Sequence, residues 1–311
     1  MGRLLMRDNM RLRAFLMAAL SMSMIAFATS DSCGQSRTVD NQGNAVGNID
    51  PKKTYVLAIG CCVPWRGLRT CRDTVRLFVE AATARLGIPP ENILTVVDEQ
   101  ATYEGVANGF TWLSRKSGPD KTIIVYYNGH GTLLPEGSDS GDPEYVFILW
   151  SKEFPFAGLQ AVLAHIWMND LEFSALVDKV PGKAKLVIAD TCHALGAWED
   201  LHPKGTKIDY GLKGAALIAA SEAGQLAFST PKYALFTKEM VAAMNSGVGN
   251  LKDAFDLAQR KTRKESRIMC SDLRKKTSKL DCIEQGPTLE DPQNIVPRFL
   301  LRNYGGKGAQ R

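Results

Sequence analysis

The sequence lacks several features that mark common classes of protein. No two of its cysteines have the CxxC spacing of structural zinc sites, so a zinc-stabilised fold is not expected. No apolar run reaches the ~20 residues that a membrane-spanning helix needs. The basic stretch at residues 260–279 contains no aromatic residue, which predicts a solvated helical face rather than a nucleic-acid surface. We therefore expect no zinc site, no stable membrane span after processing and no nucleic-acid partner.

The first 28 residues have the layout of a secretory signal peptide. Arg11 and Arg13 precede an apolar run at residues 14–28, which ends in the small-x-small sequence Ala26-Phe27-Ala28. An uncleaved membrane anchor is the alternative. Cleavage would remove four arginines and one aspartate, so the net charge would fall from +5 to +2. We expect a secreted or periplasmic protein with a flexible leader at residues 29–52.

The number and spacing of the cysteines predict which of them are paired. Seven cysteines in an exported protein leave at least one thiol unpaired within the chain. The spacing of the others predicts two local disulfides: Cys270 with Cys282, and Cys71 with either Cys61 or Cys62. Cys192 belongs to neither cluster and is therefore the candidate free thiol.

Apolar runs alternate with segments of helical periodicity between residues 53 and 303. The predicted strands are 55–60, 92–98, 122–128, 144–150, 185–190, 215–221 and 296–302. The predicted helices are 73–87, 102–114, 169–180, 233–247 and 250–266. Several strands are continuous apolar runs, as expected when both faces of a parallel sheet are covered. The pattern predicts a single α/β domain with a mostly parallel central sheet, helices on both faces, and a tail at residues 304–311.

Two of the predicted strands end in a reactive side chain. The strand at 122–128 runs into Gly129-His130-Gly131, and the strand at 185–190 runs into Thr191-Cys192-His193. In sheets of this kind, sites form beyond the carboxyl ends of the strands. We therefore expect His130 and Cys192 to lie in one crevice.

This pair of residue types suits nucleophilic catalysis. A nearby imidazole favours the thiolate, which is the reactive form of a thiol. The glycines beside His130 would let the backbone turn sharply, and the backbone N–H groups of Gly131 and Cys192 are candidate donors to an oxyanion. A structural histidine and an inert buried thiol are the alternatives for each residue alone. His193 is a rival base, which we expect to be structural.

The motifs around His130 and Cys192 resemble those of a known family. YYNGHG at residues 126–131 resembles the Y-S-G-H-G motif of caspase-like cysteine peptidases, and DTCHALG at 190–196 resembles the D-S-C-H-S-G motif of metacaspases. Other stretches that resemble family segments, in the same order, are 55–60, 68–74, 216–229, 234–244 and 293–301. The ordered set covers about residues 54–302 and is similar to metacaspases and orthocaspases.

The resemblance implies an endopeptidase that works through an acyl-enzyme, with Cys192 as nucleophile and His130 as general acid and base. Metacaspases cleave after Arg or Lys, so the implied substrates are peptides or proteins with such a residue before the cut. Asp73 and Asp190 match acidic positions of the primary pocket, and Glu222 is a weaker candidate. A helix N-cap is the alternative for Asp73. We expect no required cofactor and a monomer.

Departures from the family motifs leave some points open. Asn128 and Thr191 each replace a serine, and residues 194–196 read Ala-Leu-Gly instead of Ser-Gly. The candidate calcium ligands are Asp170, Glu199 and Asp200, and the sequence leaves calcium dependence open. The polar loop at 198–214 is a candidate site of self-cleavage. The alternatives to an active metacaspase-like enzyme are a catalytically silent caspase-like binding domain and a legumain- or gingipain-like peptidase.

Overall fold

The computed structural model describes residues 47–303, apart from residues 64–68, 135–143, 153–165, 195–213, 223 and 277–281. The chain divides into two units, residues 1–36 and 37–311, and every described residue belongs to the second. The predicted signal peptide, most of the predicted leader, the loop at 198–213 and the tail lie outside the described residues. None of the described helices is both long enough and apolar enough to cross a membrane.

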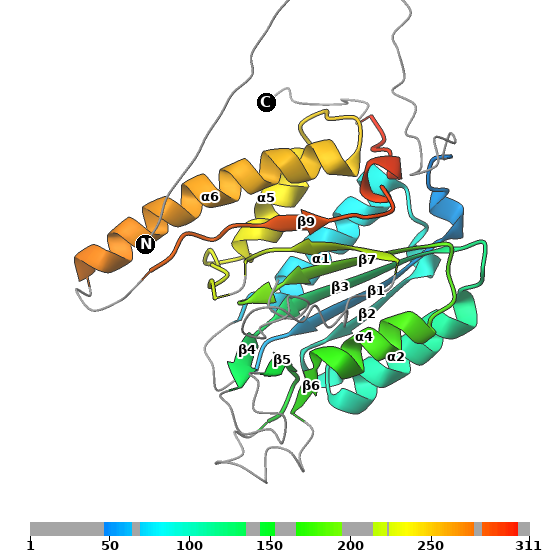
Figure 1. The fold of residues 1–311 in the computed structure, drawn as a ribbon, viewed down its shortest axis with the longest axis horizontal. Helices are drawn as coiled ribbons and strands as arrows, with labels where there is room; N and C mark the ends of the chain where they lie inside the picture. Colours follow the sequence, from blue (N-terminus) through cyan, green and yellow to red (C-terminus); the bar gives the residue numbers. More distant parts are fainter. Residues whose placement is uncertain are drawn as a thin grey trace, which may run out of the picture. The chain divides into compact units, whose positions relative to one another are not determined.

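A six-stranded sheet forms the centre of this unit (Figure 1). Its strands lie in the order β2-β1-β3-β7-β8-β9, and the first five are parallel whereas β9 runs antiparallel to β8. The strands are β1 (Thr54–Cys61), β2 (Ile93–Val97), β3 (Thr122–Gly129), β7 (Ala184–Asp190), β8 (Ala215–Ala219) and β9 (Thr288–Glu290). All eight residues of β3 are buried, which explains its continuous apolar sequence.

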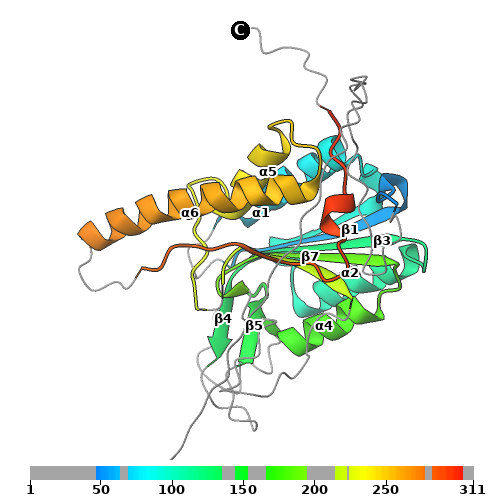
Figure 2. The ribbon, with the colours of Figure 1, turned by 45° about the horizontal axis from the view of Figure 1, so that its top comes forward.

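Helices cover both faces of the sheet, as predicted (Figures 1 and 2). They are α1 (Cys71–Ala81), which continues into a π-helical turn (Ala82–Leu86), α2 (Tyr103–Lys116), α4 (Asp170–Lys179), α5 (Leu235–Met244) and α6 (Leu251–Lys276). Helices α1, α5 and α6 lie on one face, and α2 and α4 lie on the other. The core divides accordingly, because Val56 and Ala58 of β1 join one buried cluster while Leu57 and Ile59 join the other.

The ends of several helices follow from local chemistry. Gly87 adopts a left-handed conformation, with φ of 74°, and ends the turn that extends α1. Thr102 caps α2 by accepting from the N–H of Gly105. Asn169 caps α4 in a reciprocal capping box with Glu172. These caps agree with the predicted helix starts.

A second, antiparallel sheet lies beyond the carboxyl ends of the central strands (Figure 1). It consists of β4 (Gly131–Leu134), β5 (Glu144–Ile148) and β6 (Trp167–Asn169). Strand β4 starts immediately after His130, so the chain leaves one sheet and enters the other at that residue. The sequence predicted β5 but not β4 or β6, which are only four and three residues long.

The predicted closing strand at 296–302 is wrong. Val296–Arg298 forms a 3₁₀ turn, and β9 lies at that edge of the sheet instead. The cause is local, because Pro297 has no N–H to pair with a neighbouring strand. In addition, the Asp291 carboxylate accepts from the N–H groups of Ile295 and Val296, each at 2.7 Å, which holds the chain in a turn.

Helix α6 extends ten residues beyond its predicted end at residue 266. The basic residues Arg260, Lys261, Arg263 and Lys264 are exposed on it. The described part of the basic stretch is therefore helical with these residues exposed, as predicted.

Two disulfides join neighbouring segments of the described chain. Cys270 pairs with Cys282, as predicted, and Cys71 pairs with Cys62 rather than with Cys61. Cys61 and Cys192 remain as thiols in the part of the chain that the structure describes, and Cys61 is buried whereas Cys192 is partly exposed. Cys192 is therefore the more accessible of these two thiols.

Candidate active site

The register of the central sheet places His130 and Cys192 at the same edge. Strands β3 and β7 are parallel neighbours in which Asn128 pairs with Asp190. His130 and Cys192 each follow two residues later, beyond the last paired position. Neighbouring strands lie ~4.8 Å apart, so these two residues leave the sheet side by side. Both are partly exposed, as a catalytic pair that meets a substrate must be.

The two glycines beside His130 are required by crowding. A Cβ atom on Gly129 would lie 2.7 Å from the carbonyl oxygen of Cys61 on β1. A Cβ atom on Gly131 would collide with the Tyr145 hydroxyl and lie 2.5 Å from Thr191 Oγ1. Neither glycine has a positive φ. The sharp turn expected from the sequence is therefore not the reason for these glycines, which instead let three strands approach closely.

The backbone of His130 is held from the side of β5. Its carbonyl oxygen accepts from the N–H of Ile148 at 3.0 Å, and the buried Tyr127 hydroxyl lies 2.9 Å from the same oxygen. The Tyr127 hydroxyl also lies 2.8 Å from the carbonyl oxygen of Ile148. These contacts fix the point at which the chain passes from β3 to β4.

The direction of the Gly131 N–H follows from the strand pairing. Gly131 lies opposite Phe147 in the antiparallel β4–β5 pair. Because the N–H of Ile148 donates to His130, the Gly131–Phe147 pair is of the type that exchanges no backbone hydrogen bonds. The Gly131 N–H therefore points away from β5, toward the outer edge of β4. This direction suits the predicted role as an oxyanion donor.

The turn that carries Cys192 is held by hydroxyl groups from other elements. The Tyr145 hydroxyl on β5 donates to the carbonyl oxygen of Cys192 at 3.1 Å and lies 3.4 Å from Thr191 Oγ1. The Ser221 hydroxyl donates to the carbonyl oxygen of Thr191 at 3.0 Å and accepts from the N–H of Ala194 at 3.1 Å. The backbone on both sides of Cys192 is thus fixed by long-range contacts.

The segment after β8 packs against the Cys192 thiol. The N–H of Ala227 lies 3.4 Å from Cys192 Sγ, in position to donate to it. A backbone N–H directed at sulfur stabilises a thiolate, which is the nucleophilic form. The carbonyl oxygen of Gln225 accepts from the N–H of His193 at 2.7 Å. His193 itself has a φ of 53°, and burial lowers its pKa.

Asp190 is buried, with 1% of its surface exposed. Its Oδ2 atom accepts from both the backbone N–H and the hydroxyl of Thr237, at 3.0 and 2.6 Å. Among the described residues, its Oδ1 atom is buried and has no hydrogen-bond partner. Burial raises the pKa of Asp190 to about 6, although the bonds from Thr237 oppose that rise.

Asp73 lies at the third position of α1. Its carboxylate is 2.9 Å from the Arg76 guanidinium, and its side chain is 40% exposed. Thr70 occupies the N-cap position, so the alternative of an N-cap role for Asp73 is wrong. The neighbouring Thr74 accepts from the N–H of Ala234, at the start of α5. Since α5 also binds Asp190, the first turn of α1 and the Asp190 carboxylate meet at the start of one helix.

Glu222 is directed toward a different part of the surface. Its carboxylate binds Gln225 at 3.0 Å and the Arg263 guanidinium of α6 at 3.3 Å. These residues line a polar hollow of about 460 Å³ between α6 and residues 282–286. The structure thus places the Asp190 carboxylate at the start of α5, whereas Asp73 pairs with Arg76 on α1 and Glu222 faces α6.

The possible calcium ligands are only partly described. Asp170 is the first residue of α4, and Glu199 and Asp200 lie outside the described residues. Within the described part of the chain, no group of three or more His, Cys, Asp or Glu side chains is placed to hold a metal ion. Calcium binding therefore stays a prediction.

The sequence reasoning missed the residues that support the site. Besides Tyr145, Ser221 and Thr237, the buried Gln285 accepts from the N–H of Phe228 and donates to the carbonyl oxygen of Ala220, both at 2.9 Å. It thereby anchors the segment that contacts Cys192. No local pattern marks these residues, because each acts on a strand end far away in sequence.

Comparisons with known proteins agree with this arrangement. Residues 68–290 match the family model described as the caspase domain. Metacaspase-4 of Arabidopsis thaliana is 27% identical over 154 residues, which cover 47% of this chain and 34% of that protein. Metacaspase-1 of Meyerozyma guilliermondii is 22% identical over 149 residues, which cover 46% and 35%. The chain therefore spans about a third of the length of these relatives.

Solved structures of similar fold cover more of the chain. A protein of Geobacter sulfurreducens matches with a TM-score of 0.55 and 17% identity, over 81% of this chain and 98% of that one. Caspase-1 from Spodoptera frugiperda matches with a TM-score of 0.53 and 10% identity, over 80% and 90%. At these identities the likeness concerns the fold alone, and it confirms the predicted α/β architecture.

Proposed function

Because the chain belongs to the caspase domain family, we propose that it is a cysteine endopeptidase of the metacaspase type, which cleaves proteins after Arg or Lys. The observation that carries this proposal is the placement of His130 and Cys192. Both lie two residues beyond the paired positions Asn128 and Asp190 at the ends of neighbouring parallel strands. This placement suits a catalytic dyad, and no third member is needed.

In the proposed reaction, the Cys192 thiolate attacks the carbonyl carbon of the scissile peptide bond. His130 first accepts the thiol proton and then donates it to the departing amine, as the C–N bond breaks and a thioester forms. A water molecule, deprotonated by His130, then attacks the thioester, which releases the acid and restores the thiol. The N–H groups of Gly131 and Cys192 are the proposed donors to the oxyanion in both steps.

The proposed specificity depends on carboxylates near the start of α5. A buried carboxylate binds a guanidinium through strong, charge-assisted hydrogen bonds. Asp190 supports this role because it is buried and has one oxygen without a partner among the described residues. Asp73 is the second proposed contact, for which it would have to leave its ion pair with Arg76. Glu222 is the least supported contact, since its carboxylate already binds Arg263.

The remaining parts of the proposal follow the sequence. We propose an exported monomer that requires no cofactor, and we retain calcium as an open test because Glu199 and Asp200 are not described. The lysines of the loop at 198–214 make self-cleavage there a further proposal. Intact mass measured over time, with and without calcium, tests both points if Cys192→Ala protein serves as the uncleavable control. A parent that cleaves peptides yet stays whole would refute self-cleavage alone.

The closest competing function is a silent caspase-like binding domain. The presence of both His130 and Cys192 argues against it, and a legumain- or gingipain-like enzyme fits the DTCH sequence at 190–193 less well. Iodoacetamide labelling with peptide mapping distinguishes an active peptidase from a silent binding domain. We expect fast labelling at Cys192 and slow labelling at Cys61, because burial and the nearby Asp98 carboxylate raise the pKa of Cys61 far above its usual range.

The decisive experiment is a panel of fluorogenic peptides offered to the purified mature protein. The peptides differ only in the residue before the cut, which is Arg, Lys, Asp or Asn, and Cys192→Ala protein is the blank. We expect cleavage of the Arg and Lys peptides. Preference for Asp would indicate caspase-like specificity, preference for Asn would indicate legumain-like specificity, and no cleavage with an unreactive Cys192 would indicate a silent domain.

A further inference from the structure

The start of α5 is capped by residues of other elements. Its own N-cap residue, Ala234, has no side chain that can accept a hydrogen bond. Instead, the N–H of Ala234 donates to Thr74 Oγ1 of α1, and the N–H of Thr237 donates to Asp190 Oδ2 at the end of β7, both at 3.0 Å. The first N–H groups of a helix carry partial positive charge and favour a carboxylate. The residue two positions before Cys192 is thereby tied to α5.

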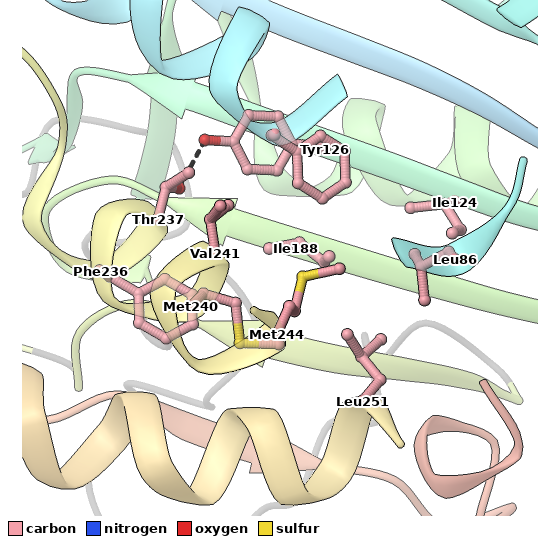
Figure 3. Close-up of a pocket in the computed structure, with 11 residues that line it drawn as sticks. Leu86, Ile124, Tyr126, Ile188, Phe236, Thr237, Met240, Val241, Met244 and Leu251 are labelled. Carbon is pink, nitrogen blue, oxygen red and sulfur yellow. Dashed lines mark hydrogen bonds between the residues drawn. The ribbon is translucent and has the colours of Figure 1, made fainter. Parts of the chain in front are cut away.

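The direction of the hydrogen bonds around Thr237 can be assigned. A threonine hydroxyl has one hydrogen, and at 2.6 Å from the ionised Asp190 Oδ2 it donates that hydrogen to the carboxylate. The Tyr126 hydroxyl, 2.7 Å from Thr237 Oγ1, must therefore be the donor of that second bond. Figure 3 shows this contact between β3 and α5. A directed chain thus runs from Tyr126 through Thr237 to Asp190.

This chain is rigidly supported. Tyr126 is fully buried, and its ring stacks on Phe78 of α1 with 4.1 Å between the ring centroids. Thr237 is 2% exposed, and its backbone is part of α5. The apolar space lined by Tyr126, Thr237 and Met240 (Figure 3) has a volume of about 10 Å³, too small for these side chains to take up other positions within it. Asp190 Oδ2 is therefore fixed by two donors that cannot easily move.

The other oxygen of the same carboxylate is in a different situation. Oδ1 is buried and has no hydrogen-bond partner among the described residues. A buried carboxylate oxygen without a donor is unfavourable unless a partner satisfies it at some stage of function. An arginine or lysine side chain of a substrate would supply such a partner. Because Oδ1 is covered in this structure, the cation would have to uncover it on binding.

We propose that Thr237 is a positioning residue for substrate specificity: it holds Oδ2 of Asp190 so that Oδ1 is left to bind the cationic side chain before the cut. This inference rests on the proposed peptidase function and adds to it a residue that does not itself touch the substrate. Without the Thr237 hydroxyl, the carboxylate keeps only the backbone donor and is free to rotate. Recognition of the cation then weakens, whereas the dyad stays in place.

The test compares Thr237→Val, which removes the hydroxyl at nearly constant size, with Thr237→Ser, which keeps it. Thr262→Val is the matched control, because Thr262 is also fully buried and its hydroxyl has no partner among the described residues. Each protein is measured with an arginine peptide and with its neutral citrulline counterpart. The rate of Cys192 alkylation by uncharged iodoacetamide reports separately on the dyad, and thermal melting reports on folding.

We expect Thr237→Val to lower kcat/KM for the arginine peptide about ten-fold, mainly through KM, as loss of one charge-assisted hydrogen bond predicts. Citrulline cleavage, alkylation and the behaviour of Thr237→Ser and Thr262→Val should change less than about two-fold. Equal losses on both peptides and in alkylation would make Thr237 a purely structural cap and overturn the inference. An unchanged preference for arginine in Thr237→Val would also overturn the inference about Thr237. A parent protein that does not prefer arginine would refute the proposed specificity itself.

Discussion

The two strand ends that carry the candidate dyad are fixed by different means. At the end of β3, atoms of β1, β5 and the Cys192 turn crowd so closely around His130 that only glycine fits on either side of it. At the end of β7, side chains from three other elements hold the chain by hydrogen bonds. Tyr145 of β5 and Ser221 after β8 bind its backbone, and Thr237 of α5 binds the Asp190 carboxylate. Steric crowding therefore positions the end of β3, whereas hydrogen bonds position the end of β7.

This difference predicts different responses to mutation. A crowded position tolerates no added atom, so a small enlargement at the His130 end should be severe. A hydrogen-bonded position loses one contact at a time, so removing a single hydroxyl at the Cys192 end should have a modest effect. The substitutions below test this contrast, beginning with the two residues that both arrangements serve to position.

The largest effects are expected from the dyad itself. Cys192→Ala removes the proposed nucleophile, and peptide cleavage should fall at least about a thousand-fold. His130→Ala removes the proposed general base, with an expected loss of about 100- to 10,000-fold. Both side chains are partly exposed, so the melting temperature should change little. Turnover of the best peptide of the panel tests this assignment. Near-parental activity in either variant would refute the catalytic dyad.

The next largest effect should come from Gly131→Ala. The added Cβ would collide with the Tyr145 hydroxyl and crowd Thr191 Oγ1 at 2.5 Å, so β4 must shift and the proposed oxyanion donor, the Gly131 N–H, must move with it. We expect unfolding in denaturant to become easier by about 1–3 kcal/mol and cleavage to fall at least about ten-fold. Gly249→Ala is the control, because its Cβ would meet no atom within 4 Å. Equal tolerance of both substitutions would show that crowding does not fix this strand end.

Asp190→Asn should separate activity from stability. The folded protein raises the pKa of Asp190 from 3.8 to about 6, so between these values the folded state binds more protons than the unfolded state. Stability from this group is therefore highest below pH 4 and falls as the pH rises to about 6. This rise in the pKa corresponds to about 3 kcal/mol of unfolding free energy, which is the most that Asn can recover at pH 8.

We expect Asp190→Asn to be at least as stable as the parent at pH 8, with a difference that shrinks toward pH 4. Cleavage of an arginine peptide should nonetheless fall at least about ten-fold, because the cation loses its charged partner. In the parent, activity on that peptide should rise with pH through about 6 as Asp190 ionises. Urea unfolding and peptide cleavage across pH 4–8 provide both measurements. A variant that loses stability at pH 8 but keeps arginine cleavage would reverse the assignment and make Asp190 a helix cap only.

The same contrast explains how much of the site could be predicted from the sequence. The strand ends at His130 and Cys192 were predictable because apolar runs and glycines are local signals. The reason for the glycines was not, since their close neighbours come from β1, β5 and the Cys192 turn. Thr237 lies 47 positions from Asp190, and Ser221 lies 30 positions from Thr191. Only the fold brings these pairs together, and no periodicity in either segment reveals them.

The errors in the predicted fold have a similar origin. The segment at 296–302 is apolar enough for a strand, but Pro297 and the hydrogen bonds that Asp291 accepts make its first three residues a 3₁₀ helix. Strand β9, at the edge of the central sheet, has only three residues, two of them half-buried, and shows no apolar run. Where a single side chain or a very short strand pairing determines the local structure, the average hydrophobicity of the segment does not predict it.

The smallest effect is expected from Tyr145→Phe, and it connects the two strand ends. Loss of the hydroxyl removes its bond to the carbonyl oxygen of Cys192, so turnover should fall about five-fold, as one neutral hydrogen bond of ~1 kcal/mol predicts.

The same hydroxyl is what the Gly131→Ala methyl group would strike. The double variant Gly131→Ala, Tyr145→Phe should therefore be more active and more stable than Gly131→Ala alone. The rescue should be partial, because Thr191 Oγ1 and the Tyr145 ring carbon Cζ still crowd the added methyl group. A double-mutant cycle on turnover and unfolding free energy measures this coupling. Simple addition of the two losses would mean that crowding by the Tyr145 hydroxyl does not position His130.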